Sequence, residues 1–535
     1  MSSDVIIRQA TRVIRGPAWA YRNARRLHLE ARHVRTLMKS VFLEECSANI
    51  RKRLSIRGDA FIETVDRAIF RHPHSPYRPL IEAAGHDFTS VKTLVGQLGV
   101  EGALQHLCAD GVYVTIEEFK GTREAHRGKR NFRFIPADFD NPMVRSGLKA
   151  ASGGTRSSRI PTTISVEDHK MGVEHFAAAL SAYGLSGRPV AVWTAHSHGV
   201  SLWAVAALTA LRTPSMEWFT LLKEGKTFYT FLTALSRLYG VTLPHLTYAP
   251  FNDAARILAW VKTVGTTAGC GILTVPSLAL RLALEAKAQK ASLENVTFIT
   301  IGEPLTPAKL RAIQAVDGRA FSSLGFTEFG RATYGCATAI APDDTHVCRD
   351  SIAVIQRRRV VDDLGTGVDA LLFTALHPYA RKILLNMETG DYAAMMQRRC
   401  GCPLESLGWT DHLQDIRSFE KLNAVGRLFF GSALHSLTEE ELPERFGGQP
   451  TDYQLLEEED SEGFTRLTLL VHPRLDGIDE HAILQSVEET LQRLSLAQSA
   501  VWRDAGVVRI RRAAPLLTAA GKLMPLHHLG VTRNP

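Results

Sequence analysis

The sequence predicts an α/β protein with a large N-terminal α/β domain and a smaller C-terminal α+β domain. The chain has 535 residues, 45% of them hydrophobic and 22% charged, which is ordinary for a globular protein and too long for one simple core. Between Pro161 and about Gly408, short strand-like runs alternate with helical runs. Around Phe419 a different pattern of strands and amphipathic helices begins. We therefore expect domains at residues 61–415 and 422–535, after a helical extension at residues 1–60.

The N-terminal segment has a helical pattern from Val5 to about Phe70, in which apolar residues stand three or four positions apart between arginines. This pattern predicts an amphipathic helical cap on the large domain. A basic helix that touches membrane lipid is the alternative, but the segment lacks the clean separation of apolar and polar faces that such a helix needs.

The large domain is predicted from two kinds of run. Strand-like runs occupy Pro189–Trp193, Ile272–Val275 and Val296–Ile301, and helical runs occupy Gly199–Leu211 and Leu278–Lys290. Strands that alternate with helices indicate a parallel sheet with crossover helices.

The smaller domain mixes strands and helices over just more than a hundred residues. We expect strands at Arg427–Phe430, Tyr453–Glu457, Arg466–Val471 and Val507–Arg511, and helices at Glu439–Phe446 and Glu480–Leu494. This order predicts a compact α+β unit.

Composition and charge exclude several classes of protein. The longest apolar runs are too short and too polar to span a membrane, and no secretory signal is recognisable, so we expect a cytoplasmic protein. The net charge of +8 comes with basic residues concentrated in Arg8–Arg53, without an aromatic platform or a nucleic-acid-reading motif. No nucleic-acid partner is therefore expected, whereas small anions such as ATP or coenzyme A could use the positive field.

A loop rich in small and hydroxyl residues occupies Ala151–Pro161 and contains Ser152, Gly153, Gly154 and Thr155. Backbone amides without bulky side chains, hydroxyl groups and the two arginines of the loop suit the oxygens of a polyphosphate. A flexible linker is the alternative, because loops of this composition are common.

Four further motifs follow in order. They are Gly302-Glu303-Pro304-Leu305, Leu324-Gly325-Phe326-Thr327-Glu328, Thr389-Gly390-Asp391 and Thr518-Ala519-Ala520-Gly521-Lys522. Each motif alone is weak, and the information lies in their order and spacing.

Together these motifs resemble the adenylate-forming superfamily, in particular its phenylacetate–coenzyme A ligase and acyl-protein synthetase branch. The loop at Ser152–Thr155 resembles the family's phosphate loop, and the four motifs resemble its Gly-Glu-Pro/Leu, Tyr-Gly-x-Thr-Glu, Thr-Gly-Asp and Thr-x-x-Gly-Lys segments. The segment Ser75–Leu80 is similar to the branch's N-terminal Ser-Pro-Tyr-Tyr motif. The resemblance runs from about His72 to Leu526 and implies an adenylate-forming enzyme fold.

The resemblance implies an AMP-forming acid–thiol ligase. Such an enzyme uses ATP and Mg²⁺ to convert a carboxylic acid into an acyl-adenylate, and then transfers the acyl group to coenzyme A, a carrier protein or a protein cysteine. Developing negative charge on the α-phosphate needs a metal and a cation. The residues with implied catalytic roles are Lys522, which bridges carboxylate and nucleotide, Thr327, which bonds an α-phosphate oxygen, and Glu328, which holds Mg²⁺.

Other residues are implied in binding. The ATP- or AMP-binding set is Ser152, Gly153, Gly154, Thr155, Gly302, Glu303, Pro304, Gly325, Asp391, which accepts the ribose hydroxyls, and Arg417. The implied border of the acyl pocket is His196, His198 and Gly199. The aromatic residues Trp193, Phe219, Phe228 and Phe231 could line that pocket or belong to the core.

The sequence departs from the family pattern at three places. Leu324 replaces the usual Tyr, Pro525 replaces an Arg, and the hinge motif is reduced to residues 416–421, with Arg417 and Glu420 as the closest matches. In this family the C-terminal domain rotates between the two reaction steps, so these residues are the implied pivot.

Cysteine and histidine residues follow two of the motifs. Cys336 and His346 come after the Thr-Glu pair, and Cys400 and Cys402 come after Thr-Gly-Asp. Three thiolates and one imidazole form a closed tetrahedral zinc set. Cys348 could replace His346, and the alternative is a group of buried free thiols.

Two alternatives lie outside this class. Pro189–Trp193 leads into Thr194-Ala195-His196-Ser197-His198-Gly199 and then a helix, which is similar to the nucleophile elbow of an α/β-hydrolase with Ser197 as nucleophile. Ala195, however, stands where the motif needs its first glycine. The second alternative is a non-catalytic scaffold that retains the ATP-binding fold.

Overall fold

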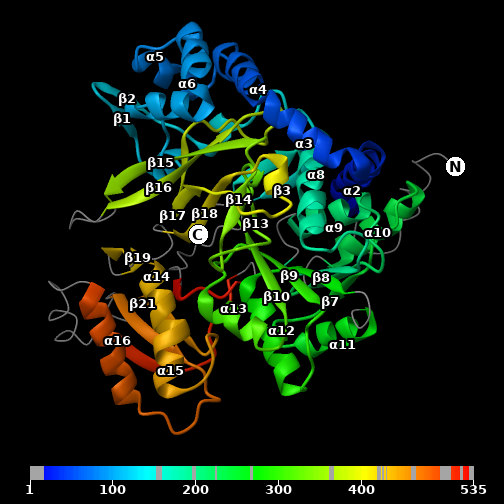
Figure 1. Cartoon of the computed structure of the whole chain (residues 1–535), viewed down its shortest axis with the longest axis vertical. Coiled ribbons are helices and arrows are strands. Elements are labelled where there is room, and N and C mark those ends of the chain that lie inside the picture. The colour runs from blue at the N-terminus through cyan, green and yellow to red at the C-terminus, as the bar shows by residue number, and fades with distance from the viewer. Residues whose placement is uncertain are drawn as a thin grey trace.

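The computed structural model describes residues 17–151, 160–195, 200–222, 226–264, 269–360, 367–418, 423–424, 427–428, 431–459, 465–494, 508–518 and 522–528. The predicted α/β class is confirmed, because a large parallel sheet with crossover helices is joined to a second large sheet and a small C-terminal sheet. Figure 1 shows these layers, with the N-terminal helices at the top and the C-terminal unit at the lower left.

The first sheet has six strands, all parallel, in the order β10-β9-β8-β5-β6-β7. Its strands are β5 (Val190–Thr194), β6 (Glu217–Thr220), β7 (Leu246–Tyr248), β8 (Cys270–Thr274), β9 (Val296–Ile301) and β10 (Arg319–Ser323). The helices of this layer are α8 (Val166–Ala182), α9 (Val200–Ala210), α10 (Lys226–Leu238), α11 (Ala254–Val264), α12 (Pro276–Ala288) and α13 (Pro307–Gln314). The predicted alternation of strand and helix is therefore confirmed here.

This sheet is buried on both faces, which explains why its strands are continuous apolar runs rather than alternating ones. In β5, Val190 and Val192 belong to one hydrophobic cluster, whereas Ala191 and Trp193 belong to another on the opposite face. The two clusters are the cores between the sheet and its two helical layers.

The second sheet was not predicted as a separate layer. It is antiparallel, in the order β13-β14-β18-β17-β16-β15. Its strands are β13 (Thr333–Gly335), β14 (Thr345–Val347), β15 (Ile352–Val360), β16 (Gly367–Ala375), β17 (Met387–Gln397) and β18 (Asp411–Ser418). The expectation of strand–helix alternation up to Gly408 is therefore wrong after α13 and β10, because from β13 to β18 the described strands pair antiparallel and the one helical element described among them is a 3-10 turn at Glu405–Leu407.

The N-terminal part is helical, as predicted, and extends further along the chain than expected. It comprises α2 (Pro17–Ser40), α3 (Cys46–Ser55), α4 (Arg57–Thr64), a π-helical turn at Val65–Phe70, α5 (Tyr77–Ala83) and α6 (Phe88–Ala109). Residues of α4 to α6 pack with the second sheet in one hydrophobic cluster, whereas the apolar side of α2 packs with the helices of the first. The helical cap thus covers both sheets.

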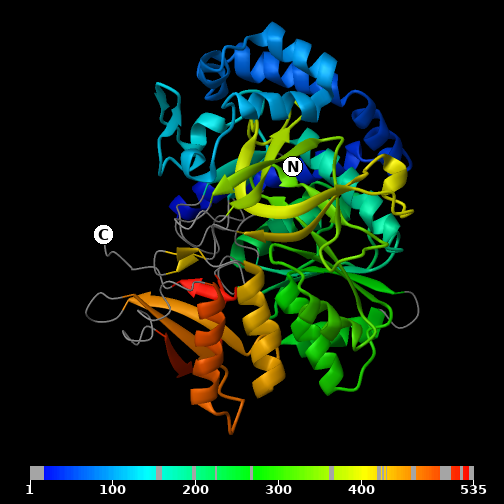
Figure 2. The same cartoon turned by 60° about the vertical axis from the view of Figure 1, so that its left-hand side comes forward.

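The C-terminal unit matches the expected α+β pattern closely. It contains α14 (Gly431–Ser436), a π-helical turn (Leu437–Glu441), α15 (Leu442–Phe446), β21 (Tyr453–Glu459), β22 (Thr465–Val471), α16 (Glu480–Leu494), β23 (Val508–Arg512) and β24 (Leu526–His528). The sheet order is β23-β22-β21-β24, and the unit has its own hydrophobic cluster. Figure 2 shows this orange and red unit beside the green helices of the first sheet.

No helix among the described residues is long and apolar enough to cross a membrane.

Candidate functional site

A cavity of about 120 Å³ lies where the first sheet, the second sheet and the C-terminal unit meet. The loops after β9 and β10 open at the same edge of the first sheet, because parallel strands present their carboxyl ends together. The residues that line the cavity are Gly302, Glu303, Pro304, Ser322, Ser323, Leu324, Gly325, Phe326, Asp343, Asp391, Ile416, Arg417, Ser418, His435, Lys522 and Met524. Seven of the predicted nucleotide-site residues therefore lie together, although the chain separates them by up to 220 positions.

Lys522 reaches across the cavity from the C-terminal unit to the loop after β9. A Cβ atom built on Gly302 would lie 2.8 Å from Lys522 Nζ and 2.9 Å from its Cε, so a larger residue here would displace the end of the lysine side chain from this position. Gly302 also has a φ of +88°, which favours glycine. The Lys522 carbonyl accepts a hydrogen bond from the Thr518 amide (2.9 Å), and the Lys522 amide donates to Thr518 Oγ1 (3.1 Å), so two hydrogen bonds join these residues.

Glu303 joins the first sheet to the C-terminal unit. Its Oε1 accepts a hydrogen bond from the Leu523 amide (2.9 Å), and its Oε2 accepts bonds from the amide and hydroxyl of Ser277, at the start of α12. Burial raises the pKa of Glu303, and Lys309, Ser277 and Lys522 oppose that rise. The position of Glu303 in the structure is therefore that of a tether beside the lysine.

Asp391 and Arg417 come from neighbouring strands of the second sheet. Asp391 of β17 pairs with Ser418 of β18, and its Oδ2 accepts a hydrogen bond from Thr389 Oγ1 (3.2 Å). Arg417 Nη1 donates to Asp343 Oδ2 (2.7 Å), and the same carboxylate accepts the amides of residues 415 and 416. Asp343 was missed by sequence reasoning because it belongs to no motif; it holds Arg417 at the cavity wall.

A buried ion pair forms the second link between the first sheet and the C-terminal unit. Lys309 Nζ of α13 donates to Glu439 Oε1 (2.9 Å), and the Thr306 hydroxyl donates to Glu439 Oε2. His435, which lines the cavity, bonds the same Oε1 through Nδ1 (2.8 Å). Burial alone would raise the pKa of Glu439. Lys309 and His435 lower that pKa by more than burial raises it, so the carboxylate stays charged. We call this set, with Thr306, the Glu439 latch.

Thr327 and Glu328 lie at the tip of a hairpin between β11 (Gly325–Phe326) and β12 (Gly330–Arg331). They flank the cavity rather than line it, since its wall ends at Phe326. Arg381 Nη1 donates to the Thr327 carbonyl (3.2 Å) and holds the hairpin from its other side. Burial raises the pKa of Glu328 against the opposing effects of Lys382 and Arg381. Their implied roles remain predictions.

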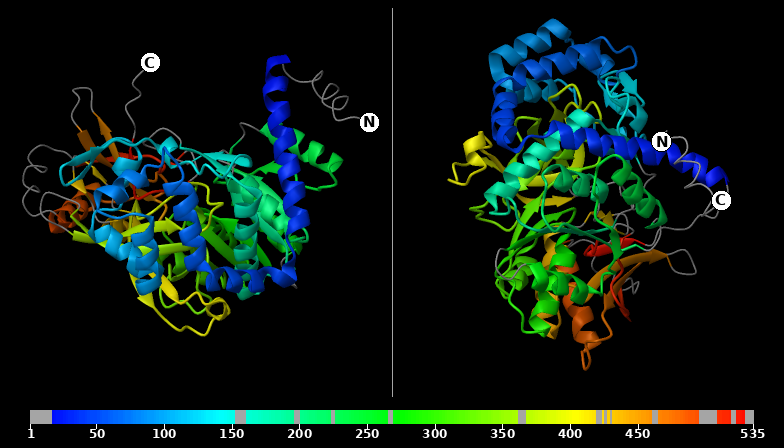
Figure 3. Two further views of the ribbon diagram at one scale, coloured as in Figure 1. Left: turned by 90° about the horizontal axis from the view of Figure 1, so that it is seen from above. Right: turned by 90° about the vertical axis from the view of Figure 1, so that its right-hand side faces the viewer.

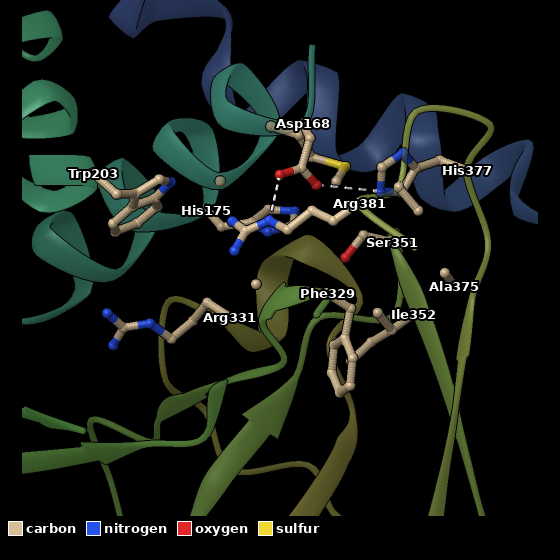
Figure 4. A pocket seen from close by; sticks show the side chains of 14 residues that line it. Asp168, His175, Trp203, Phe329, Arg331, Ser351, Ile352, Ala375, His377 and Arg381 are labelled. Carbon is tan, nitrogen blue, oxygen red and sulfur yellow. Dashed lines mark hydrogen bonds and ion pairs between the residues drawn. The ribbon is translucent and has the colours of Figure 1, made fainter. Parts of the chain in front are cut away.

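A second, smaller cavity of about 20 Å³ lies on the far side of the same hairpin. Figure 4 shows Asp168 between Arg381 and His377, which lie 2.8 Å and 3.8 Å from its oxygens. Burial lowers the pKa of His377 to about 4, so it is neutral near pH 7. The space suits about one water molecule. It is too small for an organic acid, and its charged residues serve to hold the hairpin.

Several predicted residues lie outside the described residues. They are Ser152, Gly153, Gly154 and Thr155 of the phosphate loop, His196, His198 and Gly199 of the acyl pocket, the alternative nucleophile Ser197, and Glu420 of the hinge. The phosphate loop leaves β3 (Leu148–Ala151) and returns in β4 (Pro161–Ile164), where Ala151 pairs with Pro161.

The four aromatic residues proposed for an acyl pocket are core residues or pack on the core. Trp193 and Phe219 lie in the hydrophobic cluster on one face of the first sheet, whereas Phe228 and Phe231 belong to the cluster beside α2. None of them lines either cavity described here. The core interpretation is therefore the better one.

The predicted zinc ligands lie together at one end of the second sheet. The ligand atoms of Cys336, His346, Cys400 and Cys402 are all within 4.8 Å of one another. His346 Nε2 lies 3.1 Å from Cys402 Sγ and 3.6 Å from Cys400 Sγ. Gly401 has a φ of +74°, which makes the turn that presents both flanking thiols.

Groups around these four residues fix their orientation. His346 Nδ1 donates to the Trp409 carbonyl (2.6 Å), which leaves Nε2 as an acceptor facing the thiols. Glu405 accepts the amides of Cys400 and Gly401, and Arg398 Nη2 donates to Cys336 Sγ (3.4 Å). Cys348 is fully buried and outside the set, so its suggested substitution for His346 is wrong. We call these four residues the Cys–His cluster.

Comparisons with known proteins give matches among solved structures only. Neither family models nor curated proteins match the chain. The chain is similar to a 2-hydroxyisobutyryl-CoA ligase in complex with 2-HIB-AMP and CoA, with 16% identity, a TM-score of 0.45 and 91% of each chain covered. It is similar to O-succinylbenzoate coenzyme A synthetase from Bacillus subtilis, with 13% identity, a TM-score of 0.40 and coverage of 82% and 86%. It is also similar to a structure from studies of fatty acyl-adenylate ligases of E. coli and L. pneumophila, with 12% identity, a TM-score of 0.41 and coverage of 75% and 71%.

At these scores the similarities do not determine an activity. The chain's function is therefore proposed from the residues of its own cavity.

Proposed function

We propose that this protein uses ATP to activate a carboxylic acid as an acyl-adenylate and then transfers the acyl group to a thiol. One observation carries the proposal: Lys522, Glu303, Asp391 and Arg417, which come from four separate motifs, line a single cavity. The Lys522 cation beside Gly302, the Asp391 carboxylate within β17 and the Arg417 guanidinium at the wall suit an acid, a ribose and phosphates.

In the first step an oxygen of the substrate carboxylate attacks the α-phosphorus of ATP. The new oxygen–phosphorus bond forms the mixed anhydride, and the bond to the β-phosphate oxygen breaks to release pyrophosphate. Lys522 would offset the negative charge that develops between carboxylate and phosphate. Asp391 would accept the ribose hydroxyls, and Arg417, fixed by Asp343, would complete the nucleotide wall.

Mg²⁺ would be held by Glu328 together with the phosphates of ATP, because hard cations prefer oxygen ligands. When bound, it would neutralise phosphate charge. Burial raises the pKa of Glu328, whereas the nearby Lys382 and Arg381 lower it, and a bound Mg²⁺ would likewise favour the charged carboxylate. The Thr327 hydroxyl would bond an α-phosphate oxygen from the same hairpin, which Arg381 supports.

In the second step a thiol sulfur attacks the acyl carbon, the thiol proton is lost, and AMP leaves. The acceptor is coenzyme A, a carrier-protein arm or a protein cysteine. We propose that the C-terminal unit turns about residues 416–421 before this step and takes Lys522 out of the cavity. A Glu420→Pro variant should then slow thioester formation far more than adenylation; equal slowing of both steps would contradict the hinge.

The direct test is carboxylate-dependent exchange of labelled pyrophosphate into ATP over a panel of aryl, short-chain and long-chain acids. Exchange with one class of acid should fall by at least about 100-fold in Lys522→Ala, because a charge-stabilising group is lost. Lys287→Ala is the matched control, because Lys287 is exposed at the end of α12, and should keep full exchange.

Failure has two distinguishable forms. ATP binding without exchange for any acid would favour the non-catalytic scaffold. Hydrolysis of esters that is lost in Ser197→Ala would favour the α/β-hydrolase, in which the nucleophile stands between a strand and a helix, as Ser197 does between β5 and α9 in the chain.

We also propose that the Cys–His cluster holds a structural Zn²⁺. Three thiols and an imidazole whose tautomer is fixed by a backbone carbonyl match the closed donor set of structural zinc. The cluster ties the turn after β17 to the β13–β14 hairpin, so the metal would stabilise one end of the second sheet. It has no open position for catalysis.

A further inference from the structure

The positive charge of the chain is concentrated at its N-terminus. Residues 1–57 contain thirteen arginines and lysines against four aspartates and glutamates, a net charge of +9, whereas the whole chain has +8. The other 478 residues therefore carry a net charge of −1. This concentration calls for an explanation, because the candidate catalytic cavity lies elsewhere.

The basic residues of α2 occupy its outward face. Its apolar residues Leu27, Ala31, Val34 and Leu37 are buried among the helices of the first sheet. The opposite face is exposed and carries residues spaced by four, three, four and three positions: Arg25, Leu29, Arg32, Thr36 and Lys39. Arg26 and Arg35 flank it, and the single acid of the helix, Glu30, is buried. Figure 3 shows α2 crossing one side of the molecule.

Exposed apolar side chains gather in the same segment. Ten large hydrophobic residues are exposed among the described residues, and four of them lie between residues 17 and 57. They are Leu29 (46% exposed), Phe42 (55%), Leu43 (49%) and Ile56 (45%). A fifth, Leu238 at the end of α10, lies next to α2, because the neighbouring Tyr239 hydroxyl bonds His28. Exposed basic and apolar side chains therefore follow one another along residues 25–43, and the exposed acids Glu44 and Glu45 come directly after them.

We propose that the exposed face of α2 (Arg25, Leu29, Arg32 and Lys39), together with Phe42 and Leu43 just after the helix, docks on an anionic lipid bilayer. Basic groups are attracted to negatively charged lipid headgroups, and exposed apolar groups gain by entering the interface. The helix would lie on the membrane and not span it. A nucleic acid would use the charge but would leave Phe42 and Leu43 in water.

The structure thus changes the interpretation of the N-terminal segment. In the sequence, its apolar residues fall on more than one side of the helix, which argues against a membrane-surface helix. In the structure, the main apolar side of α2 is buried against the protein. The exposed face of the helix is basic and includes the exposed apolar residue Leu29. The proposal does not depend on the proposed catalytic function.

The test is co-sedimentation of the full chain with vesicles of phosphatidylcholine alone or mixed with phosphatidylglycerol. Binding should require phosphatidylglycerol and should weaken as salt rises. The variant Arg25→Glu/Arg32→Glu/Lys39→Glu should bind more than about tenfold more weakly, because three favourable charges are reversed. The control Lys92→Glu/Lys129→Glu/Lys287→Glu makes the same change of charge at exposed sites on other elements, and should keep binding.

A second variant tests the apolar part. Phe42→Ser/Leu43→Ser should weaken binding and leave its salt dependence unchanged. Circular dichroism and thermal unfolding would confirm that each variant is folded. The proposal is overturned if the wild type does not bind anionic vesicles, if the two charge variants bind equally, or if the chain binds duplex DNA and not vesicles.

Discussion

The Cys–His cluster and the nucleotide cavity differ in how they are assembled. The cluster draws its four residues from the β13–β14 segment and the β17–β18 connection of one sheet, within 67 positions of the chain. The cavity needs the first sheet, the second sheet and the C-terminal unit, and polar links such as Glu303 and the Glu439 latch hold these together. A site within one sheet is set by the folding of that sheet, whereas a shared site also depends on how its parts dock. Variants should therefore affect the Cys–His cluster and the nucleotide cavity separately.

The largest expected effect is loss of the cluster's metal. Cys402→Ala should reduce zinc from near one per chain to near zero, and should lower the free energy of unfolding by several kcal/mol, because metal binding adds directly to stability. Metal analysis and chemical denaturation measure both. Cys348→Ala is the matched control, a buried thiol outside the cluster that should keep the zinc. Absence of zinc in the wild type would end this proposal.

The Glu439 latch should give the next largest effect. Lys309→Met leaves the buried Glu439 carboxylate without its cation, which costs about 3–5 kcal/mol for a buried pair. The docked arrangement should be lost, so pyrophosphate exchange should fall sharply. Thioester formation from added acyl-adenylate should fall less, and zinc should stay bound.

A double variant checks this interpretation. Lys309→Met/Glu439→Leu replaces both charges with apolar groups, and should recover much of the exchange, since apolar replacement of a whole buried pair is often nearly neutral. If the single variant loses exchange, thioester formation and zinc together, it has unfolded the chain and the comparison between the two sites fails.

Gly302→Ala should have a smaller effect on the cavity alone. The new Cβ would meet Lys522 Nζ at 2.8 Å and would also strain a backbone with a φ of +88°. Because the lysine can shift its flexible end, we expect exchange to fall by about tenfold. Gly184→Ala is the control, since its φ of +73° is similar and no atom lies within 4 Å of its Cβ position. Equal loss in both variants would show that backbone strain, and not the lysine, is responsible.

The same difference explains what the sequence could predict. The C-terminal strands and helices and the parallel strands of the first sheet follow from local apolar patterns, and these expectations hold within a few residues. The second sheet was missed because the apolar and polar residues of its strands alternate too weakly to mark them as strands. The cluster was found because its ligands are chemically distinctive residues at short spacings.

The cavity was predicted only in part. Gly302, Asp391 and Lys522 stand in motifs and were found, whereas Asp343 and His435 were not, since they belong to no motif. Their place is set by docking: Asp343 holds Arg417, and His435 joins Glu439 to the cavity. No local sequence pattern predicts these contacts. Asp343 and Arg417 are more than 70 positions apart, and the place of His435 depends on Glu439, which pairs with Lys309 of the first sheet's helical layer.

The smallest expected effect concerns an exposed ion pair between α13 and the C-terminal unit. Arg311 and Glu440 lie 3.3 Å apart beside the latch, but the arginine side chain is 61% exposed, so water and salt screen the pair. Arg311→Ala should therefore change stability by less than about 1 kcal/mol and leave pyrophosphate exchange within about twofold of the wild type. Thermal unfolding and exchange measure both. A loss as large as that of Lys309→Met would mean that the boundary is held by its exposed charges and not by the buried carboxylate.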